Sequence, residues 1–446
     1  MEPVTLGGTL GWRGMTAVVG ILGGGISGLA LAAHLKRPFE LLEASSHLGG
    51  LCASVLENGF TFDAAGPHIM FSKNQQVLAR MVEVLGRNVH RRRRRNKIWF
   101  KGRIVKYPFE NGLSDLSPED RFECILGYLQ NPWDKPPQNL EEWAYATFGK
   151  GISEKYFLPY NRKIWNVEPA EITLEWVARI PKPPLEDVLK SAIGIPTEGY
   201  LHQLNFYYPR EGGFEALVHS FERLAGNGKI LTGCPALRVS GKPGAWVVET
   251  PKGSRHYETL VSTLPIHELA AIWNGLPAAG RAALAQLRYN GLINVLLGLK
   301  EHPGCPITAL YVPDAKSPFH RLSFPKNFSK ACVPEGHFSI MAEITARAED
   351  AVWKAPDGEI LQSTVAHLHE MGLLHPAALV YSKVVRFVYG YPIYDHAYFA
   401  SVAALRGAVA SRGIHLLGRF AQFDYINSDV CVERAQILAE ELNHAE

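Results

Sequence analysis

A glycine-rich segment near the start of the chain has the residue types and spacing needed to bind a pyrophosphate. In the run Gly23-Gly24-Gly25-Ile26-Ser27-Gly28 the first glycine permits a tight turn. The second lets the backbone approach the phosphates, and the third lets a helix pack closely on the preceding strand. Glu43 follows 20 residues after Gly23, where a carboxylate can accept hydrogen bonds from ribose hydroxyls. The predicted dinucleotide contacts are Gly23, Gly25, Ile26, Ser27, Gly28 and Glu43.

A second glycine doublet, Gly49-Gly50, comes shortly after Glu43 and is followed by Leu51. It would let the chain pass close to the bound dinucleotide. Flavin enzymes with a similar N-terminus carry such a doublet just after the acid that binds the ribose, so the pairing favours FAD over a nicotinamide. We therefore add Gly50 and Leu51 to the expected cofactor contacts.

The glycine motif needs a strand before it and a helix after it. Residues 16–35 are nearly all apolar, which on hydropathy alone would also suit a membrane span or a signal peptide. The cluster of glycines in the middle and the lack of a Lys/Arg-rich start favour a buried strand, a turn and a helix over residues 26–35. With a strand at residues 39–42, this makes a βαβ unit and gives no reason to expect a membrane partner.

Further along the chain the patterns alternate between strand and helix. Strands are expected at residues 97–105, as a hairpin turning at Lys101-Gly102, and at 246–249 and 257–262. Helices are expected at residues 118–129, 140–148 and 214–224. A strand at 414–418 and a helix at 428–442 would return to the nucleotide domain. The fold class is α/β, with a Rossmann-like FAD-binding domain, a helical insert and an antiparallel β-sheet domain.

Domain boundaries follow from these elements and from the proline-rich stretches beside the helical segment. We assign residues 15–75, 205–265 and 380–446 to a discontinuous FAD-binding domain, 113–204 to the helical insert, and 76–112 with 266–379 to the β-sheet substrate domain.

Bulk composition excludes little. The 446 residues are 47% hydrophobic with a net charge of +3, which is too small to indicate nucleic acid or a membrane as the main partner. The five arginines at positions 91–95 have no interleaved aromatic residues, so we interpret them as a solvated strand edge, although one of them could face an anionic substrate. Six scattered cysteines indicate neither a metal site nor a disulfide framework and fit a reducing cytoplasm.

Short motifs from Ala17 onward occur in an order shared with one group of flavoenzymes. They are GPHIMFS at residues 66–72, VKYPFEN at 105–111, PYNRKIW at 159–165, EWVAR at 175–179, YPREGG at 208–213, SPFHR at 317–321, GYP at 390–392, and GRF at 418–420 with Tyr425. Through most of the chain these motifs resemble the UDP-galactopyranose mutases, which interconvert pyranose and furanose forms of a nucleotide sugar.

The resemblance implies an isomerase in which N5 of reduced FAD attacks the anomeric carbon of a nucleotide-linked sugar. Arg179 and Arg321 match the two arginines that clamp the diphosphate, and His68 matches a residue beside the flavin. Gly418 and Arg419 match a C-terminal pair that contacts the cofactor. The implied substrate contacts are Tyr107, Asn161, Trp165, Tyr311, Tyr391 and Tyr425.

The implied partner is a nucleoside-diphosphate sugar, and charging the flavin implies an external reductant such as NAD(P)H or a reductase. A homo-oligomer is compatible with the sequence. Purely structural roles are also compatible with the sequence. Arg179 could cap a helix, and His68 could be a core residue with its hydrogen bonds satisfied. Trp165 and Tyr391 could be core aromatic residues whose polar atom is hydrogen-bonded.

Some positions depart from the family pattern. Phe328 stands where eukaryotic-type mutases have a tyrosine, and Glu110 replaces a glutamine at the nucleotide end, where a carboxylate would repel a phosphate or select another base or sugar. Pro67 makes the loop read GPH, as in the protoporphyrinogen oxidase and amine oxidase group. The alternative function is therefore an FAD-dependent oxidase or dehydrogenase of a small metabolite. The two diphosphate-clamping arginines favour the mutase.

Overall fold

A five-stranded parallel sheet carries the glycine motif. The computed structural model of the chain describes residues 19–180, 182–199, 204–226, 228–300 and 304–444, without the side chains of Ala178 and Arg179. The strands run in the order β19 (Ile414–Leu416), β13 (Thr259–Ser262), β1 (Val19–Leu22), β2 (Phe39–Leu42) and β9 (Gly228–Leu231). Helix α1 (Ile26–His34) connects β1 to β2, so the predicted βαβ unit is confirmed.

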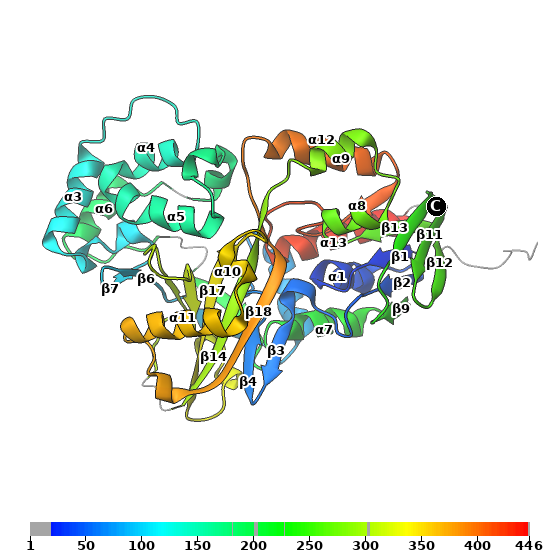
Figure 1. Cartoon of the computed structure of the whole chain (residues 1–446), viewed down its shortest axis with the longest axis horizontal. Helices are drawn as coiled ribbons and strands as arrows, with labels where there is room; N and C mark the ends of the chain where they lie inside the picture. Colours follow the sequence, from blue (N-terminus) through cyan, green and yellow to red (C-terminus); the bar gives the residue numbers. More distant parts are fainter. Residues whose placement is uncertain (1–18, 181, 200–203, 227, 301–303, 445–446) are drawn as a thin grey trace, which may run out of the picture.

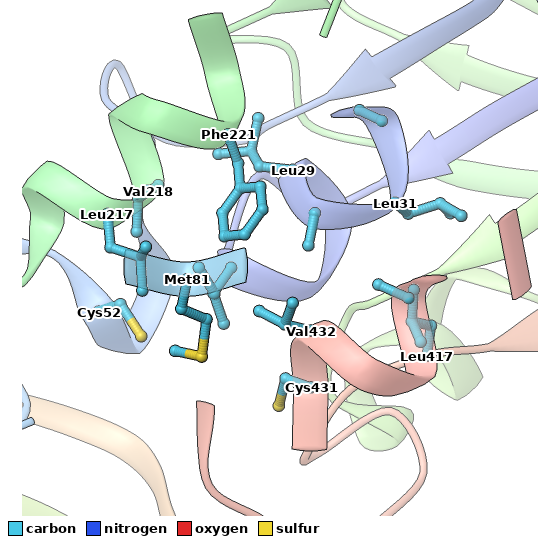
Figure 2. Close-up of a cluster of buried hydrophobic side chains, with 14 of the residues drawn as sticks. Leu29, Leu31, Cys52, Met81, Leu217, Val218, Phe221, Leu417, Cys431 and Val432 are labelled. Carbon is cyan, nitrogen blue, oxygen red and sulfur yellow. The ribbon is translucent and has the colours of Figure 1, made fainter. Parts of the chain in front are cut away.

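Helix α1 is buried between two helices that are distant in sequence. It packs against α7 (Glu215–Leu224) on one side and α13 (Ser428–His444) on the other (Figures 1 and 2). Leu29 of α1, Phe221 of α7 and Val432 of α13 are fully shielded from solvent. Because burying each such side chain contributes about 2 kcal/mol, this cluster fixes the C-terminal helix against the N-terminal unit, as the sequence predicted.

A seven-stranded sheet forms the middle of the molecule. Its order is β18 (Leu379–Pro392), β14 (Tyr289–Lys300), β17 (His337–Ala346), β16 (Arg321–Ser323), β15 (Ala309–Tyr311), β6 (Asn96–Phe100) and β7 (Arg103–Lys106). The pairs are antiparallel except β6 with β15, which is parallel. Helix α11 (Asp357–Glu370) covers one face, where Ile360 joins the same buried cluster as Ile293 of β14.

The helical insert consists of α3 (Pro118–Leu129), α4 (Leu140–Ile152), α5 (Leu158–Trp165) and α6 (Leu185–Ala192). The Ser117 hydroxyl accepts a hydrogen bond from the Asp120 N–H at 3.2 Å and caps α3, whose first residue is a proline. The insert and the parallel sheet lie at opposite ends of the molecule, with the seven-stranded sheet between them (Figure 1).

Most predicted elements are present with shifted ends. The hairpin β6–β7 turns at Lys101 and Gly102, both at positive φ, as predicted. The helix expected at 140–148 continues to Ile152 through a kink at Gly149. The strand expected at 257–262 is present as β13, but it begins at Thr259, because Tyr257 is the last residue of β12 and belongs to another sheet. Likewise β19 stops at Leu416 rather than at residue 418.

The remaining strands and helices are shorter or peripheral. They are β3 (Ser54–Glu57), β4 (Phe60–Asp63), α2 (Gln75–Leu85), β5 (His90–Arg93), β8 (Asn205–Tyr208), β10 (Arg238–Lys242), β11 (Ala245–Thr250), β12 (Gly253–Tyr257), α8 (Ile266–Ile272), α9 (Ala278–Leu284), α10 (Ala351–Lys354) and α12 (Tyr398–Ala410). Within the described ranges, no helix has the length and apolar character needed to cross a membrane.

Candidate active site

A cavity of about 830 Å³ connects the glycine turn to the helical insert. Its volume is in the range of natural ligand and cofactor sites. One end is lined by the β1–α1 turn, including Gly23, Gly25, Ile26 and Ser27, and the other by side chains of the insert, including Phe157. The lining therefore joins segments that are far apart in the sequence.

Two different structural requirements explain the glycines of the β1–α1 turn. Gly23 has a φ of +103°, which side-chain-bearing residues rarely adopt. Gly28 is not part of the cavity lining, and a Cβ there would lie 2.2 Å from the Gly23 carbonyl oxygen. Gly28 therefore permits the close packing of α1 on β1, whereas Gly23 and Gly25 line the cavity with bare backbone.

Glu43, at the end of β2, ties the glycine turn to the next loop. Its Oε2 accepts a hydrogen bond from the Gly24 N–H at 2.7 Å, and its Oε1 accepts one from the Ser45 N–H at 2.8 Å. Glu43 also lines the cavity, and each carboxylate oxygen retains a second lone pair. The position is compatible with the predicted contact to a ribose hydroxyl.

Two further glycines bring distant backbone to the same end of the cavity. Gly50 has a φ of +55° and lines the cavity together with Leu51. Gly418 has a φ of +105°, and a Cβ there would lie 2.6 Å from the Ser27 hydroxyl. Any other residue at position 418 would thus collide with the start of α1.

Arg419 provides buried hydrogen-bond donors at the end of the cavity where a flavin dinucleotide would bind. Its Nε and Nη2 are buried and have no hydrogen-bond partner among the described residues. Its guanidinium lies 4.2 Å from the centre of the Tyr425 ring and lines the cavity. Buried N–H donors are almost always satisfied in native proteins, so these two donors are available to acceptor atoms of a bound ligand. The bare glycine backbone and these donors fit FAD, which Gly23, Gly25, Glu43, Gly418 and Arg419 would hold.

His68 lies on the loop after β4 and lines the cavity. Burial, with the nearby charges of Arg419 and Arg321, lowers its pKa to about 4, so the imidazole is neutral at pH 7. Its Nδ1 has no hydrogen-bond partner in the described structure. Nδ1 is therefore available to a ligand in the cavity.

Asp63 holds the loop that carries His68. Its carboxylate accepts hydrogen bonds from the Tyr208 hydroxyl and the Phe214 N–H, both at 2.9 Å, and from the His68 N–H at 3.2 Å. Burial raises its pKa to about 6. Sequence analysis did not single out Asp63, because its partners come from a segment about 150 residues away.

Arg321 is the first residue of β16, lines the cavity, and is held in place by Glu343. Its Nη2 donates to Glu343 Oε1 at 2.8 Å and to Oε2 at 2.7 Å. Glu343 also accepts from His320 Nε2 at 2.8 Å and from the Tyr391 hydroxyl at 2.9 Å. Burial opposes ionisation of Glu343, but Arg321 and His320 hold its pKa well below the usual range. Tyr391 thus supports this cluster from outside the cavity lining, whereas the sequence predicted a direct substrate contact.

Arg179 belongs to the same prediction as Arg321, but its side chain is outside the described structure. Its backbone ends the short 3-10 helix Leu174–Arg179, which follows α5. Trp176 of that helix lines the cavity and meets the Tyr425 ring at a centroid distance of 4.9 Å.

The predicted residues Asn161 and Trp165 are joined to each other. The Trp165 indole N–H donates to Asn161 Oδ1 at 3.1 Å, and Asn161 Nδ2 donates to the Phe157 carbonyl at 2.8 Å. Both residues line the cavity, and the Trp165 ring lies 5.7 Å from that of Tyr425. The polar atoms of Asn161 are thus used within the helical insert, and Trp165 forms part of an aromatic wall.

Tyr107 and Tyr311 face each other with ring centroids 4.8 Å apart, and both line the cavity. Asn96 accepts hydrogen bonds from the Tyr311 hydroxyl at 3.1 Å and from Arg94 Nε at 2.8 Å. Arg94 therefore lines the cavity, although it belongs to the run of five arginines interpreted as a solvated edge. Exposure alternates along that run: Arg91, Arg93 and Arg95 are exposed, as the solvated interpretation expects, whereas Arg92 and Arg94 are partly buried. Arg94 matches the alternative that one of the five faces the cavity.

Two further kinds of side chain bear on the chemistry of the cavity: potential metal ligands and cysteines. No group of three or more histidine, cysteine, aspartate or glutamate side chains within them is arranged to hold a metal ion. Cys52 lines the cavity, and burial raises the pKa of its thiol far above the usual range, which disfavours the thiolate form.

Comparison with known proteins finds similarity to flavin-dependent enzymes. Residues 21–85 match the NAD(P)-binding Rossmann-like domain, and residues 199–404 match the flavin containing amine oxidoreductases. The chain is 27% identical over 194 residues to dTDP-fucopyranose mutase of Escherichia coli, a match that covers 40% of this chain and 51% of that protein. The chain thus spans about half the length of this curated relative.

Solved structures extend the likeness to nearly the whole chain. A reduced UDP-galactopyranose mutase superposes with a TM-score of 0.87 at 26% identity, covering 96% of this chain and 94% of that one. A putative protoporphyrinogen oxidase from Exiguobacterium sp. 255-15 superposes with a TM-score of 0.76 at 21% identity, covering 96% and 99%, and shows the shared fold alone. The predicted Rossmann-like flavoprotein fold with a helical insert and a β-sheet domain is confirmed, and the chain is UDP-galactopyranose mutase-like.

Proposed function

We propose that this UDP-galactopyranose mutase-like protein is an isomerase that interconverts the pyranose and furanose forms of a nucleotide-linked sugar. The observation that carries the proposal is the position of Arg321, a cation anchored by Glu343 in the same cavity as the flavin-compatible turn. Such a cation is needed where a nucleoside diphosphate departs and must be kept in place. The likeness to two named sugar mutases supports the same assignment.

In this proposal the chain supplies binding, orientation and electrostatics. Bound reduced FAD would supply the nucleophilic N5 for the anomeric carbon. Arg321, together with Arg179, would grip the diphosphate, while Tyr107, Tyr311 and Tyr425 would line its path. His68, neutral at pH 7, would offer a hydrogen bond beside the flavin without adding charge. The aromatic wall would exclude water from the sugar.

The reductant, the domain limits and the location of the protein complete the proposal. NAD(P)H or a separate reductase would charge the flavin, and a cytoplasmic site would supply both. The sheet that carries the glycine turn would be the FAD-binding domain, with the helical insert closing the nucleotide end.

The proposal is tested with protein whose flavin has been reduced by dithionite. The reduced and oxidised forms are incubated without oxygen with a panel of nucleoside-diphosphate hexoses and pentoses, and products are separated by anion-exchange chromatography. A new product of unchanged mass formed only by the reduced protein is expected. Absence of any isomer, together with bleaching of the oxidised flavin by small metabolites, would establish the alternative oxidase or dehydrogenase instead.

A further inference from the structure

Lys163 is a half-buried cation on α5 that lies outside the cavity lining. Its Nζ donates to the Asp314 carbonyl at 2.6 Å and to the Val312 carbonyl at 3.2 Å. Both carbonyls belong to the turn between β15 and β16. An ammonium that donates to two backbone carbonyls restrains that backbone. Lys163 therefore ties the helical insert to one turn of the seven-stranded sheet.

The hairpin that this turn closes carries two cavity residues. Tyr311, the last residue of β15, and Arg321, the first residue of β16, are direct cross-strand partners, and both line the cavity. Val312 follows Tyr311 directly, and its N–H donates to the His320 carbonyl at 2.8 Å. A displacement of the turn would therefore move the Tyr311 ring and the Arg321 guanidinium together.

Helix α5 also supplies part of the opposite wall of the cavity. Asn161 and Trp165 of this helix line the cavity. Tyr160, about one turn before Lys163, meets the Tyr311 ring at a centroid distance of 5.3 Å. Residues three apart on a helix lie on the same face, so Tyr160 and Lys163 contact the hairpin side by side. These contacts fix the separation between the aromatic wall and the hairpin.

The charge of Lys163 changes near neutral pH. Burial lowers its pKa to about 7, and the nearby charge of Asp314 opposes that shift. At the end of the same turn, burial lowers the pKa of His320, with a smaller contribution from Lys163. The other charged groups on the elements packed against Lys163 are Arg162 with Glu168, Lys316, Glu343 with Arg321, and Arg347 with Asp350. Lys163 is therefore charged in mildly acidic solution and largely neutral at about pH 8.5.

We propose that Lys163 is a positioning residue that holds the β15–β16 hairpin against α5, so that Arg321 meets the diphosphate of a nucleotide sugar seated on the insert. The inference rests on the proposed function, in which Arg321 binds that diphosphate. Lys163 acts through Arg321 and does not touch the ligand. Its charged form donates stronger hydrogen bonds to the two carbonyls than the neutral amine, so the diphosphate is bound most tightly while Lys163 is charged.

The test measures binding to the oxidised, FAD-loaded protein, so it does not depend on turnover. UDP-glucose, dTDP-glucose and GDP-mannose are the probes, and the one that the wild type binds most tightly is then compared with its own nucleoside. At about pH 6, Lys163→Met is expected to weaken binding of the sugar nucleotide about tenfold, because misplacing a binding group is costly. The affinity for the nucleoside, which has no diphosphate to meet Arg321, should be unchanged. Calorimetric titration measures both affinities.

Three comparisons separate positioning from a general loss of structure. Lys163→Arg keeps a charge and donors and should recover affinity relative to Lys163→Met, whereas Lys163→Gln replaces the methionine variant if that variant does not load FAD. Lys316→Met, at an exposed position in the same turn, should bind like the wild type. The deficit of Lys163→Met should shrink to about threefold at about pH 8.5, where the wild-type lysine is largely neutral. Other groups that titrate in the cavity cancel in this comparison.

Several results would overturn the inference. These are equal affinity of Lys163→Met and the wild type for the sugar nucleotide, an equal loss of affinity for the nucleoside, no recovery in Lys163→Arg, or a deficit that is undiminished at the higher pH. Absence of binding of every probe to the wild type would refute the proposed function and the inference with it. Isomerisation by a Lys163→Met protein of unchanged affinity would refute the inference alone.

Discussion

Arg321 and Glu343 are direct cross-strand partners, and Arg321 Nη2 donates to both oxygens of the Glu343 carboxylate, at 2.8 and 2.7 Å. Glu343 is 1% exposed, whereas the Arg321 side chain is 20% exposed. The carboxylate therefore fixes the guanidinium from beneath, and the rest of the guanidinium remains available to an anion in the cavity. Because the pair is buried, each member depends on the other.

Glu343→Gln is expected to weaken binding of UDP by about tenfold and to lower the free energy of unfolding by about 3 kcal/mol. The amide cannot compensate the charge of Arg321 or accept two bonds through carboxylate oxygens. Calorimetric titration with UDP and denaturant unfolding measure the two effects. Glu335→Gln, an exposed glutamate just before β17, is the matched control and should change neither. Unaltered UDP affinity in a folded Glu343→Gln protein would show that Arg321 does not need this anchor.

Arg419→Ala is expected to raise the dissociation constant for FAD by about 10- to 100-fold, since hydrogen bonds to a charged group contribute about 1.5–3 kcal/mol. Its buried Nε and Nη2 have no partner among the described residues and are available to acceptor atoms of the bound flavin dinucleotide. The visible flavin absorbance per protein, followed during dilution, measures this loss. Arg412→Ala, in the exposed turn after α12, should retain the wild-type flavin content. Equal retention by both variants would place the flavin away from Arg419.

The βαβ unit could be predicted because its signals are local. Gly23, Gly28 and Glu43 fall within about 20 residues, and each spacing follows from the geometry of a strand, a turn and a helix. The anchoring role of Glu343 could not be predicted. It depends on the register between β16 and β17, which is decided by packing of the whole sheet.

The inward position of the Arg94 side chain could not be predicted from the sequence either. All five arginines at positions 91–95 look alike in the sequence, and nothing in it decides which ones point inward. The pairing of β5 with β8 turns Arg91 and Arg93 outward. Arg94 follows β5 and reaches Asn96 and the cavity. The resemblance pointed to Arg321, which lines the cavity, whereas the side chain of Arg94 could be placed only from the structure.

Gly28→Ala is expected to abolish stable FAD binding, because its Cβ would lie 2.2 Å from the Gly23 carbonyl oxygen and would push α1 away from β1. Gly407→Ala is the matched control, since Gly407 is also a helical glycine and has open space where the Cβ would be. That substitution should be neutral or stabilise the protein by up to about 1 kcal/mol. Flavin content and thermal unfolding compare the two variants, and similar behaviour of both would mean that α1 is not held closely to β1.

His68 predicts a specific pH dependence of stability. Burial, with the charges of Arg419 and Arg321, lowers its pKa to about 4 in the folded protein, while the unfolded chain has a value near 6.5. Between these values the unfolded chain binds more protons, so stability is complete above about pH 6.5 and falls as the pH decreases toward about 4. The loss reaches about 3 kcal/mol at most. His68→Asn removes the titrating group and should therefore lose less stability than the wild type over this range.

Urea unfolding of both FAD-loaded proteins at a series of pH values measures this divergence, because the other titrating groups, including Asp63, cancel in the difference between them. His256→Asn, at an exposed position on β12, serves as the control substitution of a histidine outside the cavity lining. If the wild type and His68→Asn lose stability in parallel as the pH falls, then His68 is solvated in the folded protein. It would then carry a charge in mildly acidic solution, which would argue against a neutral hydrogen-bonding group beside the flavin.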